Sequence, residues 1–211
     1  MNRVGYDRDH ERHILLARQV IQNEARALHE TSENIGPAFI EAVEMIARCT
    51  GQIICCGVGK SGHVAAKIAS TLSSTGTPAS FLSAAEAVHG DLGGLHRGDI
   101  VVAISHSGEN PELLSVVPVF RQFEAPIIAI TDGTKSSLSL IANVVLSLGK
   151  TSEADPIGLA PTASSAAAMA LGDAIALAVA QHHGYTLTDF QHHPGGAIGK
   201  LMESVYKPEA A

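Results

Sequence analysis

The chain has 211 residues, of which 45% are hydrophobic and 17% charged, so we expect one soluble domain with a sizeable core. Its formal net charge of −7 argues against nucleic acid or an anionic membrane as the principal partner. The three cysteines, Cys49, Cys55 and Cys56, lack C-x-x-C spacing, and the charged N-terminus lacks the apolar core of a signal peptide. We therefore expect core cysteines in a reducing, cytoplasmic compartment.

The N-terminal region, residues 1–50, predicts two helices. Over residues 8–32, apolar residues such as Ile14 and Ile21 recur at helical spacing, with charged residues on the other faces. This apolar stripe needs a partner, and the sequence leaves open whether that partner is the same domain or a neighbouring subunit. A second helix follows Pro37, and residues 51–211 supply the sheet core and the C-terminal helices of what we expect to be a single domain.

A glycine-rich turn follows the first predicted strand. The apolar run Ile53–Cys56 precedes Gly57–Gly62 (GVGKSG), and Val64–Leu72 then has the pattern of a helix. Unpaired N–H groups at such a helix start, with glycines that permit close approach, suit a phosphate. Lys60 and Ser61 add a positive charge and a hydroxyl donor.

The spacing of this turn overlaps two other motifs. A Walker P-loop would need glycine where Ile54 stands, so that motif is excluded. The spacing fits the G-x-G-x-x-G of a dinucleotide site, but the next strand ends in Ser83, and Glu86 comes late for the acidic residue that holds the ribose. That alternative, and a turn that serves strand–helix packing alone, stay open.

The same design recurs about fifty residues later. Ile100–Ile104 predicts a strand, Ser105–Asn110 (SHSGEN) a polar loop, and Pro111–Phe120 a helix that Asn110 can cap. Loops at the carboxyl ends of parallel strands can face one crevice, where open α/β sheets bind ligands. One compact phosphorylated ligand would satisfy both loops.

The remaining elements continue the alternation of strands and helices. Pro126–Thr131 and Val144–Leu148 predict two more strands, which favours an α/β fold with a parallel sheet covered by helices on both faces, a three-layer αβα sandwich. The apolar stretch Ala163–Ala180 approaches transmembrane length, but Asp173 interrupts it and alanine dominates it. We therefore expect a buried helix there.

Three further polar groups are candidates for function. Glu86, His89 and Asp91 lie on a glycine-rich stretch between strands. Glu153 precedes Thr162, which can cap the long helix and lend a hydroxyl to an anion. His192 and His193 occupy a late turn without a third ligand at metal spacing, so no metal is expected.

Together, seven segments of the sequence resemble the sugar isomerase (SIS) domain family, and within it the arabinose 5-phosphate isomerases of the Kdo pathway of lipopolysaccharide and capsule. The segments are GVGKSG (57–62), STGTPASF (74–81), AEAVHGDLGGL (85–95), SHSGENPELL (105–114), EADPIGLAPT (153–162), LGDAIALA (171–178) and HPGGAIG (193–199). The resemblance implies a flavodoxin-like five-stranded parallel sheet and a homotetramer with sites at subunit interfaces. It also implies interconversion of D-ribulose 5-phosphate and D-arabinose 5-phosphate, here without the two C-terminal CBS domains that most such isomerases carry.

The resemblance also assigns roles to residues. The positions that match the family's catalytic residues are Lys60, Glu112, Glu153 and His193, and those that match its substrate contacts are Thr77 and His89. An isomerisation through an enediol needs acid/base groups and no organic cofactor. We expect Glu153 or Glu112 to act as the base, His193 to serve ring opening or proton transfer between O1 and O2, and Lys60 to stabilise the oxyanion. The residues expected at the phosphate are Ser61, Ser105, Ser107 and Thr162.

Two alternatives remain at the level of function. Isomerases with this domain also act on hexulose 6-phosphate or sedoheptulose 7-phosphate, and the fold does not choose among these substrates. The domain also serves non-catalytic regulators that bind phosphosugars. Such regulators usually append a DNA-binding module, for which the first 50 residues offer too little.

Overall fold

The computed structural model describes residues 3–186 and Asp189. The elements in chain order are α1 (Arg3–Glu33), α2 (Pro37–Ala47), β1 (Ile53–Gly57), α3 (Gly59–Ser74), β2 (Ala79–Ser83), α4 (Ala84–Ala87), the 3-10 helix η1 (Asp91–Gly94), β3 (Ile100–Ile104), α5 (Pro111–Gln122), β4 (Ile127–Thr131), α6 (Ser137–Ile141), β5 (Val144–Ser147) and α7 (Ala163–His182).

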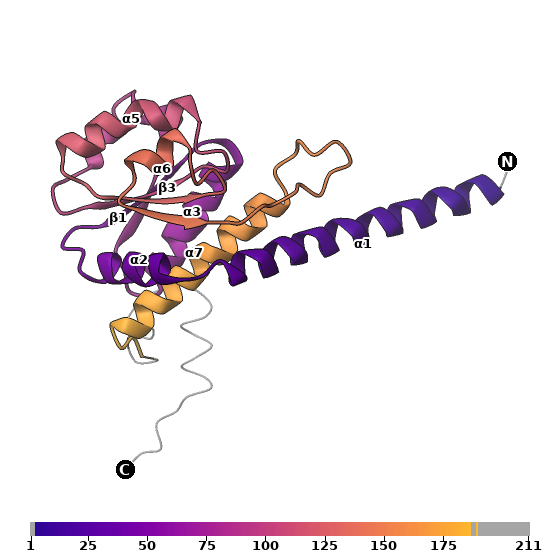
Figure 1. Cartoon of the computed structure of the whole chain (residues 1–211), viewed down its shortest axis with the longest axis horizontal. Helices are drawn as coiled ribbons and strands as arrows, with labels where there is room; N and C mark the ends of the chain where they lie inside the picture. The colour runs from indigo at the N-terminus through magenta and orange to yellow at the C-terminus, as the bar shows by residue number, and fades with distance from the viewer. Residues whose placement is uncertain (1–2, 187–188, 190–211) are drawn as a thin grey trace, which may run out of the picture.

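The five strands form one parallel sheet in the order β2-β1-β3-β4-β5. In the central pairings Ile53 of β1 lies opposite both Ala79 of β2 and Ile100 of β3. Because every strand runs the same way, the loops that follow the strands gather at one edge of the sheet (Figure 1). The expected α/β fold with a five-stranded parallel sheet is confirmed.

Alternate residues of each strand point to opposite faces and fill two cores. One core lies between the sheet and α2, α3 and α7, and the other between the sheet and α4, α5 and α6. Cys55 faces the first core and Cys56 the second. Burial raises the pKa of each thiol to about 12, so both stay protonated and behave as the small core hydrophobes that the sequence predicts.

Helix α7 is long and apolar enough, by length and composition alone, to cross a membrane, yet 56% of its most apolar window is buried inside the domain. It packs against α1, α2 and α3. Gly172 permits a close approach of α7 to α3, because a Cβ there would lie 2.2 Å from Cδ1 of Ile68 on α3. Asp173, the charge that interrupts the apolar stretch, forms an ion pair with Lys67 of α3. The expectation of a buried helix is confirmed for the inner face of α7.

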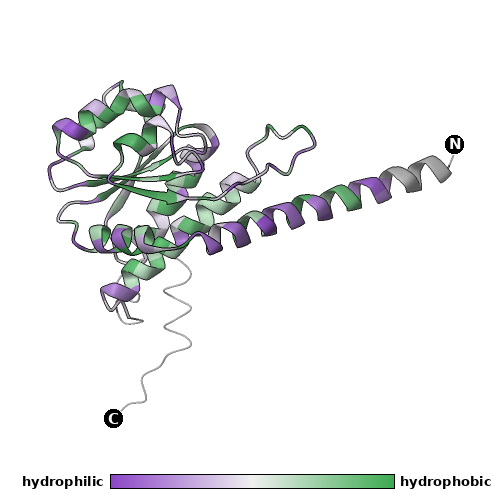
Figure 2. Cartoon of the chain, in the orientation of Figure 1, coloured by the Kyte–Doolittle hydropathy of each residue, from purple (hydrophilic) through white to green (hydrophobic). Residues whose placement is uncertain are grey.

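Helix α1 contacts the domain near its C-terminal end and extends away from it toward the N-terminus (Figures 1 and 2). The hydroxyl of Thr31 is buried and donates to the carbonyl oxygen of Leu148, which ties the end of α1 to the end of β5. Farther out, the side chains of Ile14 and Ile21 are 54% and 67% exposed. The C-terminal end of α1 therefore packs within the domain through Ala27 and Thr31, whereas the apolar stripe of Ile14, Ile21 and Leu28 is uncovered in a single chain.

Candidate functional site

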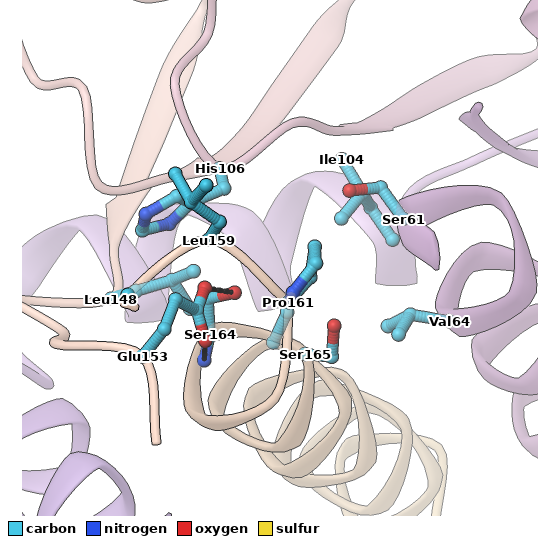
Figure 3. A pocket seen from close by; sticks show the side chains of 12 residues that line it. Ser61, Val64, Ile104, His106, Leu148, Glu153, Leu159, Pro161, Ser164 and Ser165 are labelled. Carbon is cyan, nitrogen blue, oxygen red and sulfur yellow. Dashed lines mark hydrogen bonds between the residues drawn. The ribbon is translucent and has the colours of Figure 1, made fainter. Parts of the chain in front are cut away.

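A pocket of about 200 Å³ opens at the carboxyl edge of the sheet, between the starts of α3 and α7 (Figure 3). Its walls come from the ends of β3 and β5, the first turns of the two helices, and the loop that joins β5 to α7. The lining residues are Ser61, Val64, Ile104, His106, Leu148, Glu153, Gly158, Leu159, Pro161, Ser164, Ser165 and Ala168. In Figure 3, Ser61 and Val64 lie toward one end of the pocket, and Glu153, Leu159 and His106 toward the other.

The first end of the pocket is the start of α3. This helix begins at Gly59, five residues before the start that the sequence indicated at Val64. Lys60 and Ser61 therefore lie in its first turn. Its N-cap residue, Val58, makes no side-chain cap, and the first N–H groups of the helix carry the positive end of the helix dipole. Ser61 lines the pocket beside these groups, whereas Lys60 is exposed and does not line it. An anion is favoured at this end.

The other end of the pocket holds the carboxylate of Glu153, which caps α7. One carboxylate oxygen, Oε2, accepts hydrogen bonds from the backbone N–H of Thr162 at 2.8 Å, from the Thr162 hydroxyl at 3.1 Å and from the N–H of Ser164 at 3.4 Å. The other, Oε1, accepts a short hydrogen bond from the Ser164 hydroxyl. The Thr162 hydroxyl in turn accepts from the N–H of Ala154, which closes the loop on itself. Thr162 therefore holds the Glu153 carboxylate in place through its N–H and its hydroxyl. It is not among the lining residues of the pocket.

These contacts set the charge of Glu153. Partial burial raises the pKa of the carboxyl group, but hydrogen bonds from Ser164 and Thr162 together outweigh burial and leave the pKa below its usual range. Glu153 is consequently ionised at neutral pH, with its negative charge at the positive end of α7. The pocket thus joins a carboxylate at one end to an anion-favouring helix start at the other.

His106 is a pocket residue that the sequence analysis did not select. Strand β3 alternates, so Val102 and Ile104 face α7, and continuing this period by two residues puts His106 on the same side. By the same alternation, the two serines that flank His106 fall on the opposite side. The Ser105 hydroxyl accepts from the N–H of Gly108, and the Ser107 hydroxyl accepts from the N–H of Glu109. Neither serine lines the pocket, and their role at a phosphate stays a prediction.

Three other candidates lie outside the pocket of a single chain. Glu112 is exposed in the first turn of α5, on the opposite face of the sheet from α7. His89 is exposed in the turn after α4, where its backbone N–H donates to the carbonyl oxygen of Glu86. Thr77 is buried before β2, at the amino edge of the sheet, and its hydroxyl has no hydrogen-bond partner among the described residues. His193 lies outside the described residues. The roles of all four stay predictions.

Most of the chain matches a known domain. A model of the SIS domain matches residues 45–178, which is more than half of the chain. The arabinose 5-phosphate isomerase KdsD of Yersinia pestis is 43% identical over 186 residues, or 88% of this chain and 57% of that protein. KdsD of Pseudomonas aeruginosa is 40% identical over 187 residues, with the same coverage of both chains. This chain therefore spans little more than half the length of these curated relatives.

Solved structures agree with the fold. The Escherichia coli CFT073 protein c3406, in complex with arabinose 5-phosphate, has a TM-score of 0.81 and 36% identity, covering 92% of this chain and 100% of that one. The Vibrio vulnificus NanR protein, complexed with ManNAc-6P, has a TM-score of 0.71 at 20% identity, covering 89% of this chain and 68% of that one, which shows the fold alone. Because the domain model and several relatives above 30% identity cover most of the sheet and its helices, this chain belongs to the SIS domain family.

Proposed function

We propose that this chain is an aldose–ketose isomerase of sugar phosphates, which interconverts D-ribulose 5-phosphate and D-arabinose 5-phosphate. The observation that carries the proposal is the 36% identity to the protein in complex with arabinose 5-phosphate, which extends over 92% of this chain and the whole of that one. The pocket supports it, because the start of α3 beside Ser61 suits the phosphate and the ionised Glu153 suits proton transfer at the other end.

The reaction requires a proton to move between neighbouring carbons. Glu153 takes a proton from C1 of ribulose 5-phosphate, the C–H electrons form the C1=C2 bond, and negative charge moves to O2. Returning the proton to C2 and re-forming a carbonyl at C1 gives the aldose. Lys60 is proposed to stabilise the oxyanion, and His193 to open the sugar ring or to move a proton between O1 and O2. Glu112 is the alternative base, and Thr77 and His89 are the proposed substrate contacts. No organic cofactor takes part in this scheme.

The test is an isomerisation assay in D₂O. Purified protein is incubated with ribulose 5-phosphate, and NMR follows the appearance of arabinose 5-phosphate. An enediol intermediate exchanges its proton with solvent through the carboxyl group, so deuterium is expected at C2 of the aldose. Hexulose 6-phosphate and sedoheptulose 7-phosphate are assayed in parallel. No conversion of any of these substrates would refute the isomerase, and faster conversion of another ketose phosphate would reassign the substrate.

The proposal extends to assembly and cellular role. The uncovered outer part of α1, with Ile14 and Ile21 exposed, supports a homotetramer in which subunits pack on this helix. Light scattering is expected to give about four times the 21.9 kDa of one chain, and a mass of one or two chains would contradict the tetramer.

A cytoplasmic role in Kdo synthesis predicts that the chain restores growth to a bacterial strain that lacks its own arabinose 5-phosphate isomerases.

A further inference from the structure

His106 is held at the pocket by its backbone, while its side chain is left uncommitted. Its carbonyl oxygen accepts hydrogen bonds from the hydroxyl of Thr131 at 3.0 Å, from the N–H of Asp132 at 3.0 Å and from the N–H of Gly133 at 3.3 Å. All three donors belong to the end of β4 and its turn. The Cα of His106 is therefore fixed to the edge of the sheet, which is the rigid support that a functional side chain needs.

The imidazole has a polar atom that the protein does not satisfy. Nδ1 of His106 is buried, and it has no hydrogen-bond partner among the described residues. Buried polar side-chain atoms in folded proteins nearly always have a partner, so each exception calls for an explanation. Here the ring lines the pocket in company with Leu148, Leu159 and Glu153 (Figure 3). The unpartnered nitrogen therefore belongs to a side chain of the pocket wall.

The chemistry at that end of the pocket narrows the role. Glu153 has both carboxylate oxygens engaged by α7 and is ionised, so it accepts a proton but donates none in this state. The oxygens on the two reacting carbons need a group that donates to one oxygen and accepts from the other. A neutral imidazole does both, with one nitrogen as donor and the other as acceptor.

We propose that His106 is a catalytic residue of the isomerisation, whose imidazole contacts O1 and O2 of the open-chain sugar phosphate and carries a proton between them. The inference rests on the proposed function. As Glu153 removes the C1 proton, the imidazole N–H gives its proton to O2, and the same ring then takes the proton of the O1 hydroxyl. The carbonyl re-forms at C1 while the Glu153 carboxyl group returns a proton to C2. No net proton is gained or lost, and ring opening is left to His193.

Two variants test this role, His106→Ala and His106→Asn, with His96→Ala as the matched control. His96 is exposed and its ring contacts the carbonyl of Gly94, away from the pocket. Both His106 variants are expected to lower kcat for ribulose 5-phosphate by about 100-fold or more, with little change in KM and with melting temperatures close to that of the wild type. Added imidazole is expected to raise kcat of His106→Ala by about tenfold or more, and to leave His96→Ala unchanged.

The outcomes separate this inference from the function on which it rests. If the wild type converts ribulose 5-phosphate and the His106 variants lose less than about 100-fold in kcat, His106 is not catalytic and the isomerase stands. A loss confined to KM, or a loss of kcat that imidazole does not raise, also overturns proton transfer by this ring. If His106→Ala does not fold, the kcat of His106→Asn decides. A wild type inactive on every sugar phosphate refutes the function and this inference with it.

Discussion

Glu153→Gln is expected to lower kcat for ribulose 5-phosphate by about 100-fold or more while the protein keeps its fold and binds substrate. A glutamine side chain fits the same place. Its carbonyl oxygen accepts from the N–H of Thr162, and its amide can donate to the hydroxyl of Ser164, so the cap of α7 is largely retained. What is removed is the negative charge and the capacity to take a proton. Initial rates measure the turnover, calorimetry measures the binding of substrate, and thermal melting shows whether the fold is kept.

Two companion variants make this result interpretable. Glu153→Ala removes the cap as well as the charge, so it is expected to cost roughly 0.5–2 kcal/mol of stability in addition to the lost turnover. Glu41→Gln makes the same chemical change at an exposed position of α2 and is expected to match the wild type in both measurements. Normal turnover of Glu153→Gln would leave Glu153 as a cap of α7 and would remove it from the chemistry.

The hydrogen bonds to Glu153 also have a pH signature. Because they hold its pKa below the usual value of about 4.3, the folded state binds fewer protons than the unfolded chain between the two pKa values. The stabilisation is therefore fully present above pH about 4.3 and is lost as the pH falls through the folded-state pKa. Any advantage in melting temperature of the wild type over Glu153→Gln is expected to narrow below that pH. An advantage that stays constant there would contradict the assigned contacts.

The sequence was sufficient to predict the sheet and the edge of the sheet at which the pocket lies. Strand patterns with polar loops after them determined both, and Ser61 and Glu153 do line one pocket. The direction of individual side chains was harder to predict. Lys60 and Glu112 were selected by motif. Whether Lys60 faces the pocket depends on how α3 is rotated on the sheet, and Glu112 belongs to a helix on the other face of the sheet.

Contacts between the pocket loops were also beyond the sequence pattern. Glu153 accepts hydrogen bonds from Thr162 and Ser164, which lie 9 and 11 positions later in the chain, across an irregular loop. No periodic pattern in the sequence predicts such contacts. The start of α3 at Gly59 was missed because the glycines in GVGKSG are typical of a turn. His106, by contrast, could have been found from the alternation of β3, because it continues the side of Ile104.

Gly57→Ala is expected to weaken substrate binding by moving the phosphate end of the pocket. A Cβ at Gly57, the last residue of β1, would lie 2.9 Å from the carbonyl oxygen of Ser61 and 3.1 Å from the backbone nitrogen of Gly62. These are backbone atoms in the first turn of α3, so no side chain can swing aside, and the helix start itself must shift. Overpacking of this kind costs about 1–3 kcal/mol of stability.

The shift changes binding more than chemistry, because Glu153 belongs to a different loop from the start of α3. KM for ribulose 5-phosphate is expected to rise about tenfold or more, with a much smaller change in kcat, since contacts to the phosphate act equally in the ground state and the transition state. Inorganic phosphate is expected to lose potency as a competitive inhibitor in parallel. The control is Gly36→Ala, because a Cβ there meets only the carbonyl oxygen of Asn34, at 4.0 Å, and α2 lines no part of the pocket. Unchanged binding by Gly57→Ala, or an equal loss in Gly36→Ala, would show that the phosphate does not bind at the start of α3.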